Sequence, residues 1–349
     1  AAGPPEPMSA PQSTHPRTRT AVRVSMLLGL ALVPGLLITA LGLSDVASLM
    51  TLACLGALLP ALLAPMRIAV ATVVFTAVAS AMAIPAATDP WLAAGLLAAT
   101  GAAVGLSARV GASGTVILAA IGIVFLVATP PDTAGLDGPA WLVVGLLAGA
   151  ASLWGAGAGL LIRRFHQASA GTTSGAAPPH AGLSRSRVGI FAAVLAVTLG
   201  TSAWVVVEFD WAHGGGWFVM TFLIVLQPYL QDAWSKTVQR ATGTVMGIAL
   251  AMGIYGVLQA SPVALYVVGA ASAVLALTIR FTTSRPYWQY VALLTPAVVL
   301  LEGVRTSVVD TAAARIGFTL LAAGIAIGIE ALMLPAVKRS AQRHHVDHY

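Results

Sequence analysis

Apolar residues occur in long runs along the 349-residue chain, and short polar stretches separate one run from the next. A helix of about 20 apolar residues crosses a lipid bilayer, so each run predicts a transmembrane helix. The predicted fold class is therefore an all-α polytopic membrane protein with about 12 transmembrane helices. The predicted spans are residues 22–43, 46–64, 68–87, 91–108, 113–130, 140–162, 188–207, 216–230, 241–258, 262–279, 287–302 and 311–335.

The positions of the charges support this count of spans. If both termini are cytoplasmic, 16 of the 18 Lys and Arg residues fall in inner segments, and only Arg305 and Arg315 lie toward the outside. The positive-inside rule requires such a segregation. The net charge of +6 is therefore explained by topology, with the lipid bilayer as partner and no nucleic acid expected. We predict a multi-pass protein of the bacterial cytoplasmic (inner) membrane.

Composition narrows the class of protein further. With 58% hydrophobic and 9% charged residues, the chain is far more apolar than a soluble domain. Its single cysteine, Cys54, lies in an apolar run, so no internal disulfide can form. We find no nucleophile–base arrangement and no metal-ligand spacing. We therefore expect neither an enzyme nor a bound metal or cofactor.

A long polar stretch rich in Gly, Ser and Pro divides the spans into six and six. The dipeptides Arg-Val, Met-Thr and Thr-Pro recur in both halves, at offsets between 164 and 170 residues. Because six is even, both halves enter the membrane from the same side and are predicted to be parallel repeats. The predicted divisions are a disordered cytoplasmic tail (1–20), the first six-helix membrane repeat (21–165), a flexible cytoplasmic linker (166–186), the second six-helix repeat (187–338) and a cytoplasmic tail (339–349).

The segment LQPYLQDAWSKTVQRATGTVMG, residues 226–247, is unusually polar for this chain. We interpret it as a polar loop that leads from the eighth span into the ninth and forms the inner mouth of a pathway. Basic side chains there would attract an anion, and aromatic rings would contact a flat apolar substrate. The predicted pathway residues of this segment and its neighbours are Gln227, Tyr229, Lys236, Arg240, Trp217 and Trp234. Gly243, Thr244 and Gly247 are interpreted as helix-packing residues, since small side chains let helices approach closely.

Ionisable side chains at membrane depth are costly and are therefore candidates for function. Arg315 is interpreted either as a structural ion pair near Asp310 or as a second anion contact nearer the outside. Glu330 is a candidate for proton coupling, because an apolar setting favours the protonated form of a carboxyl group. The alternative is that Glu330 pairs with a basic residue at the inner interface. Asp310 is a second candidate for proton coupling.

The residues from Trp217 to Leu250 resemble the signature of the fusaric-acid-resistance-like (FUSC, aromatic acid exporter) membrane family. The resemblance rests on a helix opened by a tryptophan, a Leu-Gln-Pro turn, and a Gln-Arg-x-x-Gly-Thr-x-x-Gly motif, and it extends over 186–338. Arg315 matches an arginine that precedes a Gly-rich last helix in that family. The first half keeps the layout and lacks the motif. The resemblance implies efflux of aromatic carboxylic acids.

We therefore expect a transporter that exports small organic anions, with aromatic carboxylic acids as candidate substrates and proton coupling as a candidate energy source. Two alternatives stay open, namely a passive anion channel and a non-transporting membrane scaffold for envelope assembly. The major-facilitator fold also has twelve helices in two halves. Its basic motif is reduced here to Arg67 between the second and third spans. The sequence leaves a homo-oligomer open.

Overall fold

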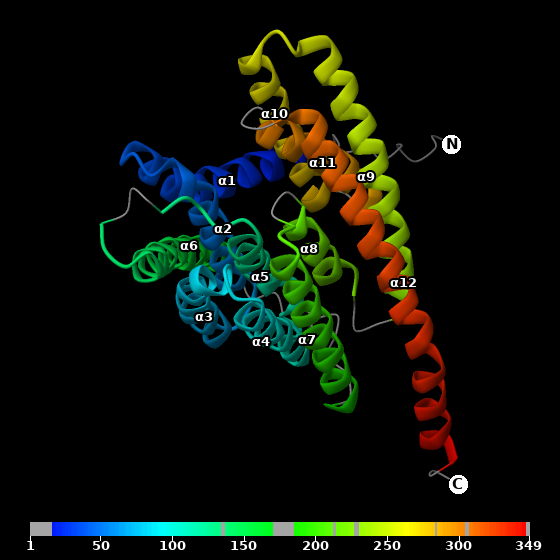
Figure 1. The fold of residues 1–349 in the computed structure, drawn as a ribbon. Helices are drawn as coiled ribbons and strands as arrows, with labels where there is room; N and C mark the ends of the chain where they lie inside the picture. The colour runs from blue at the N-terminus through cyan, green and yellow to red at the C-terminus, as the bar shows by residue number, and fades with distance from the viewer. Residues whose placement is uncertain are drawn as a thin grey trace, which may run out of the picture.

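The computed structural model describes residues 16–133, 137–169, 185–211, 214–226, 230–282, 285–303 and 307–346. Within those ranges the regular structure is entirely helical, which confirms the prediction of an all-α protein (Figure 1). The helices are α1 (Pro16–Ala40), α2 (Ser44–Leu63), α3 (Met66–Ala86), α4 (Pro90–Ser107), α5 (Ser113–Ala128), α6 (Ala140–Ser169), α7 (Arg185–Glu208), α8 (Gly215–Val225), α9 (Leu230–Leu258), α10 (Pro262–Thr282), α11 (Tyr287–Gly303) and α12 (Val308–Val346), with a 3-10 turn, η1, at Ala108–Val110.

Seven helices in the described ranges are long and apolar enough to cross a membrane. This finding supports a multi-pass membrane protein. Their spanning segments are Asp45–Leu63, Met66–Ala86, Pro90–Val110, Ala140–Phe165, Arg185–Glu208, Trp234–Leu258 and Val308–Ile329. The shorter apolar segments of α1, α5, α8, α10 and α11 also coincide with predicted spans. That these five cross the membrane as well stays a prediction.

Helix α9 begins at Leu230, well before the predicted span at residue 241. The polar segment that was interpreted as a loop is therefore largely helical, and that interpretation was wrong. Residues 230–242 contain neither Gly nor Pro and several good helix formers, so nothing in them interrupts a helix. As a result Lys236 and Arg240 are fixed to a helix that continues into the apolar part of the chain.

Close glycine contacts show how the helices of the first half are directed. Gly155 of α6 lies against the Cys54 carbonyl of α2, and Gly159 lies against the Leu58 carbonyl. Both partners advance by four residues, so α2 and α6 run in the same direction. This is the relation expected if each of the intervening helices reverses the direction of the chain.

Similar contacts orient helices elsewhere. Gly101 of α4 lies against Leu195 of α7, and Gly105 lies against Ala192, so this pair is antiparallel. In the second half, Gly243 and Gly247 of α9 lie against α11 at Val291 and Thr295, respectively. Helices α9 and α11 are therefore parallel, as two helices separated by one reversing helix should be.

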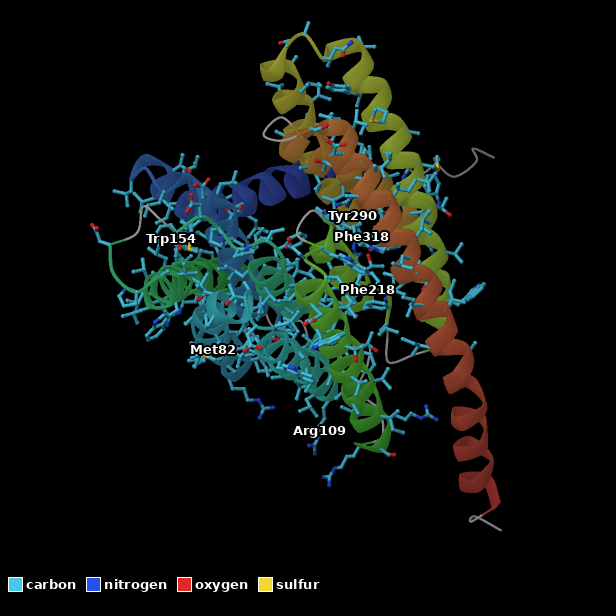
Figure 2. All side chains as sticks on the ribbon, in the orientation of Figure 1. Met82, Arg109, Trp154, Phe218, Tyr290 and Phe318 are labelled. Carbon is cyan, nitrogen blue, oxygen red and sulfur yellow. The ribbon has the colours of Figure 1, made fainter. Side chains whose placement is uncertain are left out.

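Helix α8 is short and lies at the centre of the molecule. Ten of its 11 residues are buried. At that length it rises about 16 Å, roughly half the thickness of a bilayer core. Apolar side chains all around a helix are typical of a buried one. It packs against α5, α7, α9 and α12, and Phe218 marks its position in Figure 2.

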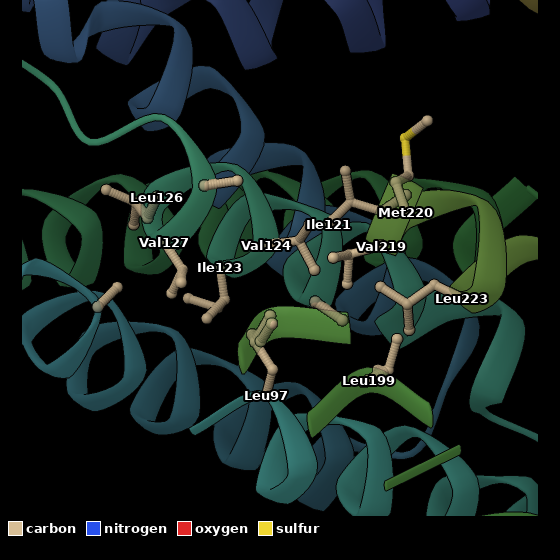
Figure 3. Packing of buried hydrophobic residues seen from close by; sticks show 14 of the residues in the cluster. Leu97, Ile121, Ile123, Val124, Leu126, Val127, Leu199, Val219, Met220 and Leu223 are labelled. Carbon is tan, nitrogen blue, oxygen red and sulfur yellow. The ribbon is translucent and has the colours of Figure 1, made fainter. Parts of the chain in front are cut away.

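The largest apolar cluster joins the two halves of the chain. Figure 3 shows Ile123 and Val124 of α5 and Leu97 of α4 packed with Leu199 of α7 and Val219 of α8. Since lipid provides no hydrophobic drive for helix association, this contact depends on close packing. The first and second halves are therefore in direct contact in the monomer.

The helix pairs that touch in one half mostly recur in the other. Helix α3 packs on α6 as α9 packs on α12, and α3 packs on α5 as α9 packs on α11. The α4–α5 contact likewise corresponds to α10–α11. Between the halves, α4 packs on α7 and α1 packs on α10. If each helix is replaced by its counterpart in the other half, α4–α7 becomes α10–α1, so these two contacts correspond to each other.

Buried positions of the first half recur in the second half at a spacing of 167 or 168 residues. At 168 residues, Ala69, Thr72, Thr76, Ala79, Ser80 and Ala83 of α3 correspond to Thr237, Arg240, Thr244, Gly247, Ile248 and Ala251 of α9, all of them buried. At the same spacing, Leu97, Gly101 and Ala108 correspond to the buried Leu265, Gly269 and Ala276. At 167 residues, Val144, Gly145, Ala148, Ser152, Gly155, Ala156 and Gly159 of α6 correspond to Thr311, Ala312, Arg315, Thr319, Ala322, Ala323 and Ala326 of α12.

Candidate functional site

Arg240 is buried on α9, with only 3% of its surface exposed. Its Nη1 donates to the hydroxyl of Tyr287 on α11 at 3.4 Å, which is a long hydrogen bond. Its Nε has no hydrogen-bond partner among the described residues. A buried guanidinium group with an unused donor is costly, so it is a strong candidate for contact with a ligand.

Arg315 is buried on α12, with 2% of its surface exposed. Its guanidinium carbon lies 4.0 Å from the ring centroid of Trp217 on α8, which is a cation–π contact. The Trp217 ring meets Phe125 of α5 edge to face, at 4.8 Å between centroids. The cation is therefore supported by aromatic rings from both halves of the chain.

Tyr290 of α11 is near enough to Arg240, Arg280 and Arg315 for their charges to act on it. Its ring lies 5.8 Å from that of Tyr287, the residue that Arg240 contacts. Sequence reasoning placed Arg315 farther along a pathway than Arg240. The charges of both arginines act on this tyrosine, and a shared role of the two in one pathway stays a prediction.

A second group of aromatic side chains lies where α8 and α12 pack together. Phe318 of α12 packs on Trp211 at 5.1 Å and on Phe218 at 6.4 Å between ring centroids. Phe218 also meets Trp211 and Phe222 edge to face. Figure 2 labels Tyr290, Phe318 and Phe218 along the region where α8, α11 and α12 lie. Flat apolar surfaces next to buried cations suit a ligand that is aromatic at one end and anionic at the other.

Gln239 fixes α9 to the start of α11. Its Oε1 accepts from the backbone N–H of Trp288 at 3.3 Å, and its Nε2 donates to Ser235 Oγ at 2.8 Å. Backbone N–H groups in the first turn of a helix lack partners in that helix. Gln239 therefore supplies an acceptor for the N–H of Trp288 and holds Arg240, its neighbour in sequence, against α11.

Small residues bring α9 and α11 close together beyond this point. A Cβ at Gly243 would lie 2.6 Å from the Trp288 carbonyl oxygen, and one at Gly247 would lie 2.6 Å from Thr295 Cβ. Thr244 lies between these glycines on the buried face. The hydroxyls of Thr244 and Thr295 are both buried without a hydrogen-bond partner among the described residues.

Other predicted site residues lie apart from this group or outside the description. Trp234 is 55% exposed on another face of α9, and Lys236 is partly exposed. Asp310 is exposed in the first turn of α12. Gln227 and Tyr229 lie outside the described residues, as does the side chain of Glu330. A role for these residues therefore stays a prediction.

Sequence reasoning missed Tyr287, Tyr290 and Thr295. All three lie on α11, in the segment YWQYVALLTP. Two tyrosines three residues apart in an otherwise apolar helix were an available signal, since such residues share a helix face. Their relation to Arg240 depends on the parallel packing of α9 and α11, which the local pattern does not contain.

The fold and its buried arginines define a multi-pass helical membrane protein with a cationic, aromatic-lined site. Residues 191–329 match the family model described as fusaric acid resistance protein-like. This match confirms the predicted resemblance for that segment, which includes Trp217, Arg240, Tyr290 and Arg315. No curated protein and no solved structure matches the chain.

Proposed function

We propose that this protein is a membrane transporter that exports small organic anions, with aromatic carboxylates as substrates. The observation that carries the proposal is the buried guanidinium group of Arg240, whose Nε lacks a hydrogen-bond partner among the described residues. A buried cation is costly, and a bound anion would compensate the charge of Arg240. The rings of Trp217 and Tyr290 provide contacts for the aromatic part of the substrate.

The proposed architecture is a pair of parallel six-helix repeats. It is supported by the buried positions that recur at 167 and 168 residues, and by the exchange of α4–α7 with α1–α10. Transporters with such repeats commonly bind substrate near the middle of the membrane at the repeat interface. The contact of Trp217 with Phe125 connects the proposed site to the first repeat.

The proposed location is the bacterial inner membrane, with both termini in the cytoplasm. The distribution of basic residues supports this orientation. Glu330 is proposed to carry the coupling proton, because it is an acidic residue of the last membrane-spanning helix. Asp310, near the other end of the segment that spans the membrane, is the second candidate.

Flux into sealed proteoliposomes tests this proposal. Radiolabelled benzoate is the probe, and uptake is measured with and without a pH gradient. We expect saturable uptake that Arg240→Ala and Arg315→Ala each reduce at least about tenfold, since each removes a charge-assisted contact. The exposed Arg109 provides a matched control, and Arg109→Ala should leave uptake unchanged.

The pH gradient separates the carrier from its alternatives. A carrier driven by protons gives accumulation that depends on the gradient and that Glu330→Gln or Asp310→Asn abolishes. A passive anion channel gives uptake that follows only the benzoate gradient and the membrane potential. Absence of any flux would support a non-transporting scaffold and would contradict the proposal.

A further inference from the structure

Several threonines in the described helices bond to their own helix. Their hydroxyl donates to the backbone carbonyl oxygen four residues earlier, a common arrangement for threonine in a helix. Of the threonines that do so, Thr72, Thr100 and Thr221 are buried, while Thr39, Thr51 and Thr129 are exposed or partly exposed. They supply an internal standard for threonine in these helices.

Thr244 and Thr295 depart from that standard. Each is at most 1% exposed, and each hydroxyl lacks a hydrogen-bond partner among the described residues. A buried hydroxyl without a partner destabilises the fold. Thr76 of α3 shares this property, but Thr244 and Thr295 differ from it in lying on facing helices next to Arg240, whose buried Nε also lacks a partner among the described residues. The combination indicates a ligand that the hydroxyls contact.

The two hydroxyls lie beside the unused donor of Arg240. Thr244 follows Arg240 by four residues, so the two side chains are neighbours on one face of α9. Thr295 lies across the α9–α11 contact, where a Cβ at Gly247 would lie 2.6 Å from Thr295 Cβ. Arg240 Nε, Thr244 Oγ1 and Thr295 Oγ1 are thus three unused donors along one helix contact.

The chemistry of these donors selects the ligand group. A guanidinium group only donates, and a hydroxyl can donate as well, so the complementary group is an acceptor. A carboxylate offers two oxygens with about four acceptor positions. The charges of Arg240 and Arg315 disfavour a cation in the same place.

We propose that Thr244 and Thr295 donate their hydroxyl hydrogens to the substrate carboxylate that Arg240 binds. This inference rests on the proposed function and assigns Thr244, interpreted from the sequence as a helix-packing residue, to the binding site. The hydroxyls position the carboxylate beside the α9–α11 contact. The ring of the substrate then extends toward Tyr290 and Trp217.

Thr76 provides a control within the same chain. It lies on α3 at the position that corresponds to Thr244, it is buried, and its hydroxyl also lacks a partner among the described residues. One turn earlier on α3, Thr72 occupies the position that corresponds to Arg240. Thr76 thus reproduces the local geometry of Thr244 without the cation.

The experiment measures the dissociation constant of benzoate from the full-length purified protein in lipid nanodiscs, by the rise in melting temperature with benzoate concentration. Thr244→Val and Thr295→Val should each weaken benzoate binding about tenfold or more, because a hydrogen bond to a charged group is lost. Thr244→Ser and Thr295→Ser, which keep the hydroxyl, should stay near the wild-type value. Thr76→Val and Thr100→Val should leave the constant unchanged.

The outcomes separate this inference from the proposed function. If Arg240→Gln abolishes benzoate binding while both valine variants bind as the wild type does, the inference is wrong and the anion site stands. If Arg240→Gln binds benzoate normally, or the wild type does not bind it, the proposed function fails together with the inference. Where a valine variant does not melt cooperatively without ligand, the alanine variant replaces it under the same criterion. A loss in Thr76→Val equal to that in Thr244→Val would also overturn the inference.

Discussion

Helices α3 and α9 share six buried positions at a spacing of 168 residues but carry different side chains at most of them. Thr72 of α3 stands where α9 has Arg240, and Ala148 of α6 stands where α12 has Arg315. Because the first half packs with small side chains at these places, helix packing does not require arginine. The two arginines therefore point to a function that belongs to the second half.

The helices that precede these pairs also differ between the halves. Helix α2 has 20 residues and continues past Gly155 and Gly159 of α6, whereas α8 has 11 and ends at Val225. The first half is thus built for continuous helix packing.

Moving the charge to the first half should produce the largest effect on stability. Thr72→Arg places an arginine on the buried face of α3 without the aromatic partners of the second half. We expect a loss of stability of about 3 kcal/mol or more, measured by unfolding in lipid nanodiscs. Thr72→Val is the matched control and should cost only about 1 kcal/mol, for the lost hydrogen bond to Ile68. Equal stability of Thr72→Arg and the wild type would show that both halves accept the charge.

Close packing between α9 and α11 should account for the next largest effect. Gly243→Leu forces side-chain atoms against the Trp288 carbonyl and Val291, so we expect a loss of about 1–3 kcal/mol. Gly253→Leu, on the same helix, meets open space among the described residues and should cost much less. Equal losses in the two variants would contradict the close contact.

The cation–π contact should contribute a smaller, measurable coupling. A double-mutant cycle of Arg315→Met and Trp217→Leu should give a coupling energy of about 1–2 kcal/mol, because the contact is desolvated. The same cycle between Arg315→Met and Trp154→Phe is the control and should be additive. Additivity in both cycles would mean that Trp217 does not stabilise the cation.

The smallest predicted effect concerns a bond found in the first half. Pro34 has no N–H, so it leaves the Leu30 carbonyl free in α1, and Trp154 Nε1 of α6 donates to that oxygen at 3.1 Å. Trp154→Phe should cost about 1 kcal/mol or less. In a Pro34→Ala background, where the helix restores its own bond, the same change should cost still less. On α12 the position that corresponds to Trp154 is Leu321, whose side chain cannot donate a hydrogen bond. This bond is therefore a difference between the two halves.

Much of this fold follows from local pattern. A run of apolar residues has few ways to satisfy its backbone in lipid other than a helix, so each predicted span coincides with an observed helix. The start of α9 was missed because polarity was interpreted as a loop. Helix propensity in residues 230–242 does not depend on apolar character, and no Gly or Pro interrupts it.

The candidate site was predictable only in part. Arg240 and Arg315 were identified from the sequence because charge is rare in apolar helices. Tyr290 and Thr295 were not, because their importance arises from the register between α9 and α11 and from hydroxyls that lack a local bond. Such relations require the positions of two helices, and a single sequence does not supply them.

The most direct test of the central claim replaces Arg240 with threonine, the residue found at the corresponding position, Thr72, of the first half. Arg240→Thr is reconstituted beside the wild type, and both benzoate flux and the melting temperature without ligand are measured. We predict that flux falls at least about tenfold while the melting temperature stays the same or rises. The reason is that Arg240→Thr removes a buried charge whose Nε lacks a partner among the described residues. Undiminished flux, or loss of flux only together with loss of the fold, would contradict the account.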